Sequence, residues 1–403
     1  MTMRFIYHHR TAGRGAEGNH IASLVRALEA AGHPVTLVSP PGVDPLKTAG
    51  GVPLDKGATK PAGIQGLWQW VSCHCPQIVF EMLELGYNLY VLFRLPPVLR
   101  RDRSAVYYER YAFFLFAGVL LAKWCGRPVI LEVNEVTGIE RARGLIMGWL
   151  ARWSERKVFA RADKIVTVSS FLQQQVLQRG GRQGGVYVLP NAVDPKRFGV
   201  NGSGRAIRRQ LALDGSTVVG FVGWFDRWDR LELLVEAVRD LRQTHPELRL
   251  LLVGDGPVTR ELRAKIQREQ LADAAILTGP IPRDEIPAYI DAMDICVLPD
   301  SNPFGSPLVL FEFMAMAKAV IAPDLPPIRD VVADGETGVI IPRGDVRLLR
   351  EAIRTLTEDA PMRVRLGQQA RRQVMERHTW EVNARCVAEL AKEVTPGSDR
   401  EER

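Results

Sequence analysis

The sequence contains little that would mark a secreted or membrane-spanning protein. Its 403 residues include only five cysteines, and the strand-like segment at residues 1–8 does not resemble a signal peptide. We therefore expect reduced thiols and a cytoplasmic location. The longest nearly uncharged apolar run, residues 111–122, is shorter than the about 20 residues that span a bilayer. It predicts a buried helix, with an interfacial helix as the alternative.

Three further kinds of site have weak signals. Cys73-His74-Cys75 brings potential metal ligands together, but no second pair follows at a zinc-like spacing, so we assign no metal. No basic stretch is interleaved with aromatic residues, which argues against nucleic-acid binding. The segment at residues 11–18, TAGRGAEG, lacks the GxGxxG order of dinucleotide-binding folds, which argues against a nicotinamide-dependent dehydrogenase.

Charge is unevenly distributed along the chain. Residues 1–190 contain 23 basic and 13 acidic residues, a net charge of +10, and the remainder contains 30 and 33, a net charge of −3. A basic first half fits an anionic acceptor or an anionic membrane surface. A soluble protein that is merely basic is the alternative.

Short apolar runs alternate with helical periods, which is typical of parallel strands joined by crossover helices. With 403 residues, of which 46% are hydrophobic, the chain can form two domains. Leu189-Pro190-Asn191 predicts the boundary, which gives domains at residues 1–190 and 191–377. A C-terminal helix at 378–395 follows, and the polar tail at 396–403 is expected to be disordered.

The expected elements of the first domain are strands at 4–7, 34–38, 77–80, 105–108, 129–133, 164–168 and 186–189, with helices at 20–31 and 139–160. Those of the second are strands at 217–222, 248–253, 274–277, 294–298, 319–322 and 338–341, with helices at 230–243, 258–269, 284–292, 307–317, 345–356 and 361–377. A last helix is expected at 380–393.

The segment at residues 301–315, SNPFGSPLVLFEFMA, is the most informative. It follows an apolar strand and begins a helix. Gly305 permits a sharp turn, Ser306 is the expected N-cap, and Pro307 suits the first helical position.

That helix start predicts a phosphate site. The N–H groups of Leu308 and Val309 have no intrahelical partner and lie at the positive end of the helix dipole. At the carboxyl edge of a strand, such amides can bind phosphate. Glu312 lies one turn further on the same face and could accept two ribose hydroxyls. The alternative is an ordinary helix in which Glu312 binds a local group.

Other strand ends carry candidate ligand-binding residues. Glu109-Arg110 and Asn134-Glu135 are each expected to follow a strand; Arg110 could bind an acceptor phosphate or pair with Glu109 or Glu135. Gly15, Glu17 and Gly18 are the candidates in the first loop, where Glu17 could instead be a first-turn helix acid. Gly254 and Gly256 could line a nucleotide pocket or serve only packing.

Many of these segments resemble family 4 glycosyltransferases, retaining enzymes of the GT-B fold. The matching stretches include GAEGNHIASLVRALEAAGHPVTLVSPPGVD, LEVNEV, ADKIVTVSSFL, VLPNAVDPKRF, FVGWFDRWDRLELLVEAV, LLVGDGP, ILTGPIPRDEIPAYIDAMDICVLPD and SNPFGSPLVLFEFMAMAKAVIAPDLPPIRDVVADGETGVIIPRGD. The resemblance implies two Rossmann-like, doubly wound parallel-sheet domains that face a cleft. The first would bind the acceptor and the second the nucleotide sugar, and the C-terminal helix would cross back to the first.

The resemblance also implies site residues. The nucleotide would contact Gly223, Pro280, Ile281, Ser306 and Pro307, as well as the glycines, helix amides and Glu312 already named. Where many members have Arg and Lys, this chain has Trp224 and Asp229, so Arg227 and Arg230 are the expected catalytic cations. Phe304 replaces a frequent acid, and Asn134 and Glu135 replace a frequent His near the donor sugar.

The reaction implied by the resemblance is transfer of a sugar, with retention, from a UDP- or GDP-sugar to a glycan or lipid-linked hydroxyl. We expect no tightly bound cofactor and no required metal, and a role in cell-surface polysaccharide or glycoconjugate synthesis. Peripheral association with the inner face of the membrane is a further expectation. A nucleotide-sugar 2-epimerase and a catalytically silent partner protein of the same fold are the alternatives.

Overall fold

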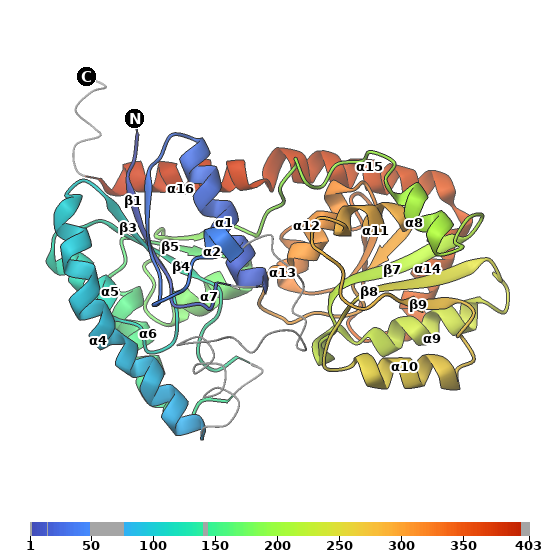
Figure 1. Ribbon diagram of the computed structural model, residues 1–403, viewed down its shortest axis with the longest axis horizontal. Helices are drawn as coiled ribbons and strands as arrows, with labels where there is room; N and C mark the ends of the chain where they lie inside the picture. Colours follow the sequence, from blue (N-terminus) through green and yellow to red (C-terminus); the bar gives the residue numbers. More distant parts are fainter. Residues whose placement is uncertain (1, 14, 49–75, 140–143, 396–403) are drawn as a thin grey trace. The chain divides into compact units, whose positions relative to one another are not determined.

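The computed structural model describes residues 2–13, 15–48, 76–139 and 144–395. They form two compact units: the first runs to Pro190 and resumes at Trp380, and the second comprises Asn191–Thr379. Cys73-His74-Cys75 and the polar tail at 396–403 lie outside the described residues. Figure 1 labels the elements of each unit.

The first unit is built on a parallel six-stranded sheet in the order β2-β1-β3-β4-β5-β6. Its strands are β1 Phe5–His8, β2 Val35–Val38, β3 Val106–Arg110, β4 Val129–Val133, β5 Lys164–Thr167 and β6 Val186–Val188. Its helices are α1 Gly15–Ala30, α2 Pro45–Thr48, α4 Gln77–Arg101, α5 Ala117–Trp124, α6 Gly148–Phe159, α7 Ser170–Gln178 and α16 Trp380–Val394.

The second unit has another parallel six-stranded sheet, in the order β12-β11-β10-β7-β8-β9. Its strands are β7 Thr217–Trp224, β8 Leu248–Asp255, β9 Ala275–Leu277, β10 Ile295–Val297, β11 Ala319–Pro323 and β12 Val339–Ile341. Its helices are α8 Gly204–Gln210, the 3-10 turn η1 Arg227–Asp229, α9 Leu231–Leu241, α10 Thr259–Arg268, α11 Ile286–Ala292, α12 Leu308–Ala315, α13 Pro326–Arg329, α14 Val346–Glu358 and α15 Ala360–Arg377.

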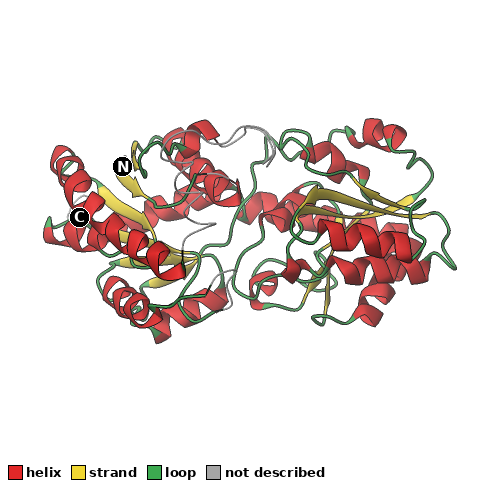
Figure 2. Cartoon of the chain, turned by 60° about the horizontal axis from the view of Figure 1, so that its bottom comes forward, coloured by secondary structure: helices red, strands yellow, loops and turns green. Residues whose placement is uncertain are grey.

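Both units have the Rossmann-like arrangement predicted from the alternating pattern, with helices beside a buried parallel sheet (Figure 2). The strands of the first unit alternate their side chains between two covered faces. Tyr7 and Tyr108 point to the face of α1, whereas His8 and Glu109 point to the face of α4 and α5. The core of the second unit is a continuous cluster of buried apolar side chains around β7, β8 and β10.

Several sequence-based predictions of single elements in the first half were wrong. Residues 77–80, expected as a strand, are the first turn of α4, because QIVF continues into a helical period rather than ending at a turn. Residues 111–122 do not form one helix: Phe114 has a left-handed φ of 62°, and α5 begins only at Ala117. The helix expected at 139–160 is shorter: residues 144–147 are not helical, and α6 runs only from Gly148 to Phe159.

Within the described residues, no helix is both long enough and apolar enough to cross a bilayer. The same part of the chain brings no three His, Cys, Asp or Glu side chains into an arrangement that could hold a metal ion. Three of the five cysteines, Cys125, Cys296 and Cys386, are described and are free thiols.

Candidate functional site

Helix α12 begins one residue later than expected, and its start is not capped by a side chain. Pro307 has an extended backbone, with ψ 119°, and is the N-cap rather than the first helical residue. Ser306 is therefore not the cap, which corrects the prediction. Among the described residues, no group accepts a hydrogen bond from the N–H of Leu308 or Val309. These two amides remain available to an anion.

Ser306 instead holds the loop in place. Its Oγ accepts a hydrogen bond from the Asn191 backbone N–H (3.1 Å), and its carbonyl accepts one from the Asn191 side chain (2.6 Å). On the other side of the turn, Asn302 Oδ1 accepts from the Gly305 N–H at 2.5 Å. A Cβ at Gly305 would come within 2.7 Å of that same oxygen, so the turn favours glycine. The segment before α12 is thus fixed by hydrogen bonds at two points.

Glu312 lies one turn into α12 and is buried. Arg283, in the loop after β9, donates from Nη2 to Glu312 Oε1 over 2.9 Å. Burial raises the pKa of Glu312, and the nearby charge of Arg283 acts in the opposite direction. Oε2 has no hydrogen-bond partner among the described residues. The ion pair orients the carboxylate and leaves one oxygen to accept a ligand hydroxyl.

The predicted cations Arg227 and Arg230 lie at the 3-10 turn after β7. The Arg227 side chain is 75% exposed and contacts Glu261 at 3.4 Å, a weak pair. Arg230 has a left-handed φ of 48° and contacts Glu232 at 3.3 Å. Neither is hydrogen-bonded to Glu312, so the structure brings Arg283, and not these two, to that carboxylate.

Asp229 is the residue at which the resemblance described above implies a lysine in many glycosyltransferases of family 4. It is buried, and its carboxylate accepts a hydrogen bond from the Asp226 backbone N–H at 3.0 Å. Burial raises the pKa of Asp229 to about 7, and the charges of Asp226 and Asp300 act in the same direction. Asp300 itself is paired with Arg343 at 2.7 Å.

The candidate glycines of the second unit, Gly223, Gly254 and Gly256, lie at or just after the neighbouring ends of strands β7 and β8. Strand β7 extends through Gly223, and β8 extends through Gly254. A Cβ at Gly254 would overlap the Gly223 carbonyl oxygen, and a Cβ at Gly256 would overlap the Phe225 backbone. This close approach of backbones explains Gly254 and Gly256 without a ligand.

Pro280 and Ile281 follow β9; Pro280 is exposed and Ile281 is half-buried. The preceding residue, Gly279, has a left-handed φ of 73° and accepts a hydrogen bond from the Gly254 N–H at 3.1 Å. The loop that carries both residues, and Arg283 three positions after Pro280, is thereby tied to the end of β8.

In the first unit, the Gly-rich loop leads directly into α1, which begins at Gly15. Gly15 has a left-handed φ of 62° and open space around its Cα. Gly18 packs on Gly13, whose carbonyl a Cβ would overlap. Glu17 is exposed in the first turn of α1, where an acid favours the helix dipole.

Asn134 lies just past β4 and is bonded to a buried glutamate that sequence reasoning missed. Asn134 Nδ2 donates to Glu132 Oε1 at 2.6 Å, and Glu135 next to it is half-buried. Arg110 Nη1 also donates to Glu132, at 2.5 Å. Arg110 therefore pairs with neither Glu109 nor Glu135, because it ends β3 on the same face as Glu132.

Glu132 is the centre of a buried polar network. Tyr108 donates to its Oε2 at 2.8 Å, and His20 Nε2 of α1 lies 3.1 Å from its Oε1. Burial alone would raise the pKa of Glu132, but the charges of His20 and Arg110 hold that pKa well below its usual range. The carboxylate is ionised and fixes the orientation of Asn134.

A second buried network lies on the opposite face of the same strands. His8 Nδ1 is 2.7 Å from Glu109 Oε2, and the Tyr107 hydroxyl donates to that oxygen at 2.5 Å. Helix α5 passes this pair at Gly118, where a Cβ would overlap both the Tyr107 hydroxyl and the Glu109 carboxylate. Because Glu109 faces this network, it cannot reach Arg110 on the other face.

Two functional candidates were missed by sequence reasoning. Arg283 follows β9 at the carboxyl edge of the second sheet, so the rule that placed the other loops would also have drawn attention to it. Glu132 carried a different signal, a single acid inside the otherwise apolar strand VILEV. A buried charge in a strand requires a partner and therefore indicates a network.

Two family models match the chain. The model for "Glycosyltransferase Family 4" matches residues 17–197, and the model for "Glycosyl transferases group 1" matches residues 204–373. Together they cover parts of both compact units.

Individual proteins agree with these matches. Glycogen synthase of Mycobacterium tuberculosis (strain CDC 1551 / Oshkosh) is 24% identical, over 93% of this chain and 90% of that protein. The GDP-mannose-dependent alpha-(1-6)-phosphatidylinositol monomannoside mannosyltransferase of Mycolicibacterium smegmatis is 25% identical, over 62% and 69% of the two chains.

Among solved structures, Anabaena HepE in complex with UDP superposes with a TM-score of 0.71 at 17% identity, covering 97% of this chain and all of that one. This likeness shows the fold. With the family matches and the two Rossmann-like units, it establishes that the chain belongs to glycosyltransferase family 4, with the GT-B fold.

Proposed function

We propose that this glycosyltransferase moves a sugar, with retention, from a UDP- or GDP-sugar to a hydroxyl of a glycan or lipid-linked acceptor. The observation that carries the proposal is the uncapped start of α12 beside Glu312. The amides of Leu308 and Val309 suit a diphosphate, and one oxygen of Glu312 suits ribose hydroxyls. The relatives support both nucleotides, because HepE was solved with UDP and the mannosyltransferase is named for GDP-mannose.

The proposed chemistry is electrostatic. Negative charge develops on the diphosphate as the glycosidic bond breaks, and preorganised N–H groups stabilise it without rearrangement. To Arg227 and Arg230 we add Arg283, since its Nε is buried without a hydrogen-bond partner among the described residues. The dipole and these cations supply positive charge, so we propose that no divalent metal or tightly bound cofactor is required.

On the acceptor side, we propose that Asn134 or Glu135 faces the transferred sugar, with Glu132 holding Asn134 in position. Gly15, Glu17 and Gly18 would flank the diphosphate and the acceptor. The basic charge of residues 1–190 supports an anionic or lipid-linked acceptor and a cytoplasmic, peripheral location on the inner face of the membrane. A role in cell-surface polysaccharide or glycoconjugate synthesis follows from such an acceptor.

The experiment is incubation of the full chain with a panel of radiolabelled UDP- and GDP-sugars and glycan or lipid acceptors, with and without EDTA. Labelled product with the anomeric configuration of the donor, formed also in EDTA, is the expected result. Inverted product contradicts retention, and loss of activity in EDTA contradicts metal independence. An epimerised donor identifies a 2-epimerase, and nucleotide binding without any turnover identifies a silent partner protein.

A further inference from the structure

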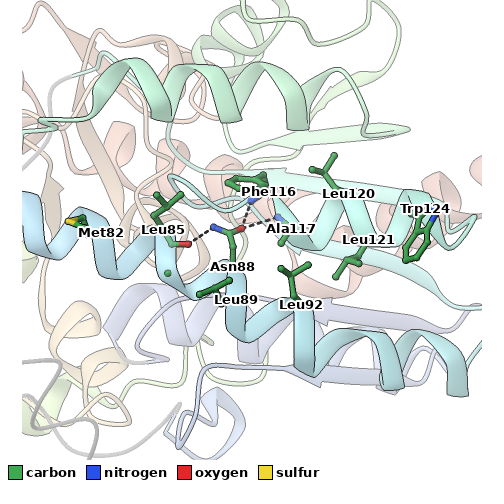
Figure 3. A pocket seen from close by; sticks show the side chains of 11 residues that line it. Met82, Leu85, Asn88, Leu89, Leu92, Phe116, Ala117, Leu120, Leu121 and Trp124 are labelled. Atoms are coloured by element: carbon green, nitrogen blue, oxygen red, sulfur yellow. Dashed lines mark hydrogen bonds between the residues drawn. The ribbon is translucent and has the colours of Figure 1, made fainter.

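Helices α4 and α5 enclose an apolar groove that the proposed transfer does not use. Its volume is about 670 Å³, and Figure 3 shows the side chains of both helices converging on it. Asn88 at its edge is fully engaged: it donates to the Leu85 carbonyl and accepts from the N–H groups of Phe116 and Ala117. The polar atoms there are satisfied, so the groove offers a ligand almost only apolar contact.

Apolar residues in and beside the groove are unusually exposed. Trp124, which lines it, is 83% exposed, and Phe93, which follows the lining residue Leu92 on α4, is 82% exposed. On α4, Met82, Leu89 and Phe93 repeat at helical spacing and form one exposed stripe. Contiguous apolar surface of this kind marks an interaction site in a soluble protein.

The neighbouring surface of α6 is aromatic and basic. Its outward-facing residues are Trp149, Arg152, Trp153, Arg156 and Lys157, followed by Arg161. The two surfaces meet because the ring of Phe116, in the groove, packs edge-on against Trp153 at 6.2 Å. Glu81 of α4 also accepts hydrogen bonds from the N–H groups before α6, at 2.7 Å each. The two surfaces are therefore held together as one face, which we name the α4–α6 face.

Charge on this face has a single sign. Within α4, α5 and α6, which are fully described, every acidic side chain is buried or engaged inward: Glu81 as above, Glu84 with Arg10, and Glu155 with Thr137. No ion pair joins the basic residues of α6 to a carboxylate in the described part of the chain. The face thus combines exposed apolar groups with unneutralised positive charge.

Resting on the peripheral location proposed above, we propose that the α4–α6 face docks on an anionic lipid bilayer, with Phe93 and Trp124 inserted among the lipids and the α6 cations at the headgroups. Stable peripheral binding takes two signals, apolar insertion and electrostatic attraction, and both are present. Tryptophan and arginine are well suited to the membrane interface. A twofold-symmetric contact between two copies through this face would instead bring the α6 cations of both copies close together, and their repulsion argues against such a dimer.

The test is flotation of the full chain with vesicles of phosphatidylcholine alone or with phosphatidylglycerol replacing part of it. The expected result is binding to the anionic vesicles that weakens with salt. Arg152→Glu with Arg156→Glu should lower the partition coefficient about tenfold or more, because each surface cation contributes to attraction. Phe93→Ser with Trp124→Ser should remove the binding that persists at high salt.

Matched controls lie in the second unit. Arg260→Glu with Arg263→Glu makes the same charge change on the exposed surface of α10, and Val364→Ser changes an apolar residue that is 56% exposed. Both should bind vesicles like the unmodified chain, and all variants should keep nucleotide affinity and melting temperature. Equal binding to neutral and anionic vesicles, no binding, or unchanged binding of the α6 variant would overturn the proposal. So would a dimer that Phe93→Ser dissociates, because the face would then be a protein interface.

Discussion

Arg283, from the loop after β9, and Glu312, from helix α12, meet as an ion pair, with Nη2 and Oε1 2.9 Å apart. The pair connects that loop with the second turn of α12. Burial opposes ionisation of Glu312, so the arginine is what keeps a carboxylate oriented there. A ligand that approaches the α12 amides would find this carboxylate already in place.

Replacing Glu312 with alanine should weaken UDP or GDP binding by about 1.5–3 kcal/mol, roughly a tenfold to hundredfold rise in Kd, because charged hydrogen bonds to the ribose are lost. Isothermal titration measures this change. Glu285→Ala removes an exposed acid from the same unit and should leave affinity unchanged. Equal affinity of the Glu312 variant and the unmodified chain would exclude Glu312 from the site.

Arg283→Met should reduce kcat by about a hundredfold, as expected for loss of one preorganised donor to the leaving group. Arg227→Glu with Arg230→Glu should also depress turnover more than stability, because Arg227 is largely exposed, Arg230 is partly exposed, and both are weakly paired. Steady-state rates and thermal melts on the same samples separate the two effects. If only the melting temperature falls, the role of the changed residues is structural.

Asp229→Asn should stabilise the protein above neutral pH and have little effect near pH 4. Burial raises the pKa of Asp229 from 3.8 to about 7. The folded chain therefore holds this proton more tightly than the unfolded chain, and stability is lost as the pH rises through that window. The gain above pH 7 is at most about 4 kcal/mol, at about 1.4 kcal/mol per pKa unit.

Urea unfolding of the Asp229 variant at several pH values measures this dependence, with Asp214→Asn, at an exposed position, as the control. A stabilisation that is the same at pH 4 and pH 8 would show that the effect is not due to ionisation.

Glu132→Ala should destabilise the first unit by about 3–5 kcal/mol at neutral pH, because Arg110 would remain buried without a counterion. The pKa of Glu132 is held below its usual value of 4.5, so its stabilisation is present above that value and is lost as the pH falls. Urea unfolding curves should show a large difference in the free energy of unfolding between this variant and the unmodified chain at pH 7, and a smaller difference at acidic pH. Glu29→Ala, at an exposed position on α1, should be neutral.

Gly256→Ala should reduce stability by about 1–3 kcal/mol, because the added methyl overlaps the Phe225 backbone and forces a shift. Gly86→Ala is the matched control, since a Cβ there meets nothing within 4 Å on an exposed helix. It should be stabilising by about 0.5–1 kcal/mol. If Gly256→Ala weakens nucleotide binding without lowering stability, the glycine acts on the ligand rather than on strand packing.

The sequence predicted the fold well and single boundaries less well. Alternation of apolar runs and helical periods was sufficient for all six strands of the second sheet. The family was identified from the resemblance of the quoted segments, and the two family models agree with it. The start of α4 was mispredicted because the four residues QIVF fit a strand as well as a helix turn. The prediction that Ser306 is the N-cap was wrong because its hydroxyl binds Asn191 instead. This partner lies 115 residues away, so no rule based on neighbouring residues could predict it.

The geometry of the candidate site was predictable to the same extent. Positions on one element, such as Leu308 and Glu312 on α12, follow from helical spacing. The partner of Glu312 does not, since Arg283 lies 29 residues before it and the pairing depends on strand order. The partners of Glu132 likewise could not be predicted from the sequence, because only the fold of α1 and β3 brings His20 and Arg110 to its carboxylate.

Gly118 has a consequence for how this chain can change over generations. Because helix α5 touches the Tyr107 hydroxyl and the Glu109 carboxylate at that glycine, even an alanine cannot be accepted while both polar groups remain. A larger residue at position 118 therefore requires that both side chains first become shorter, so these three sites are expected to vary together among descendants of this gene or not at all.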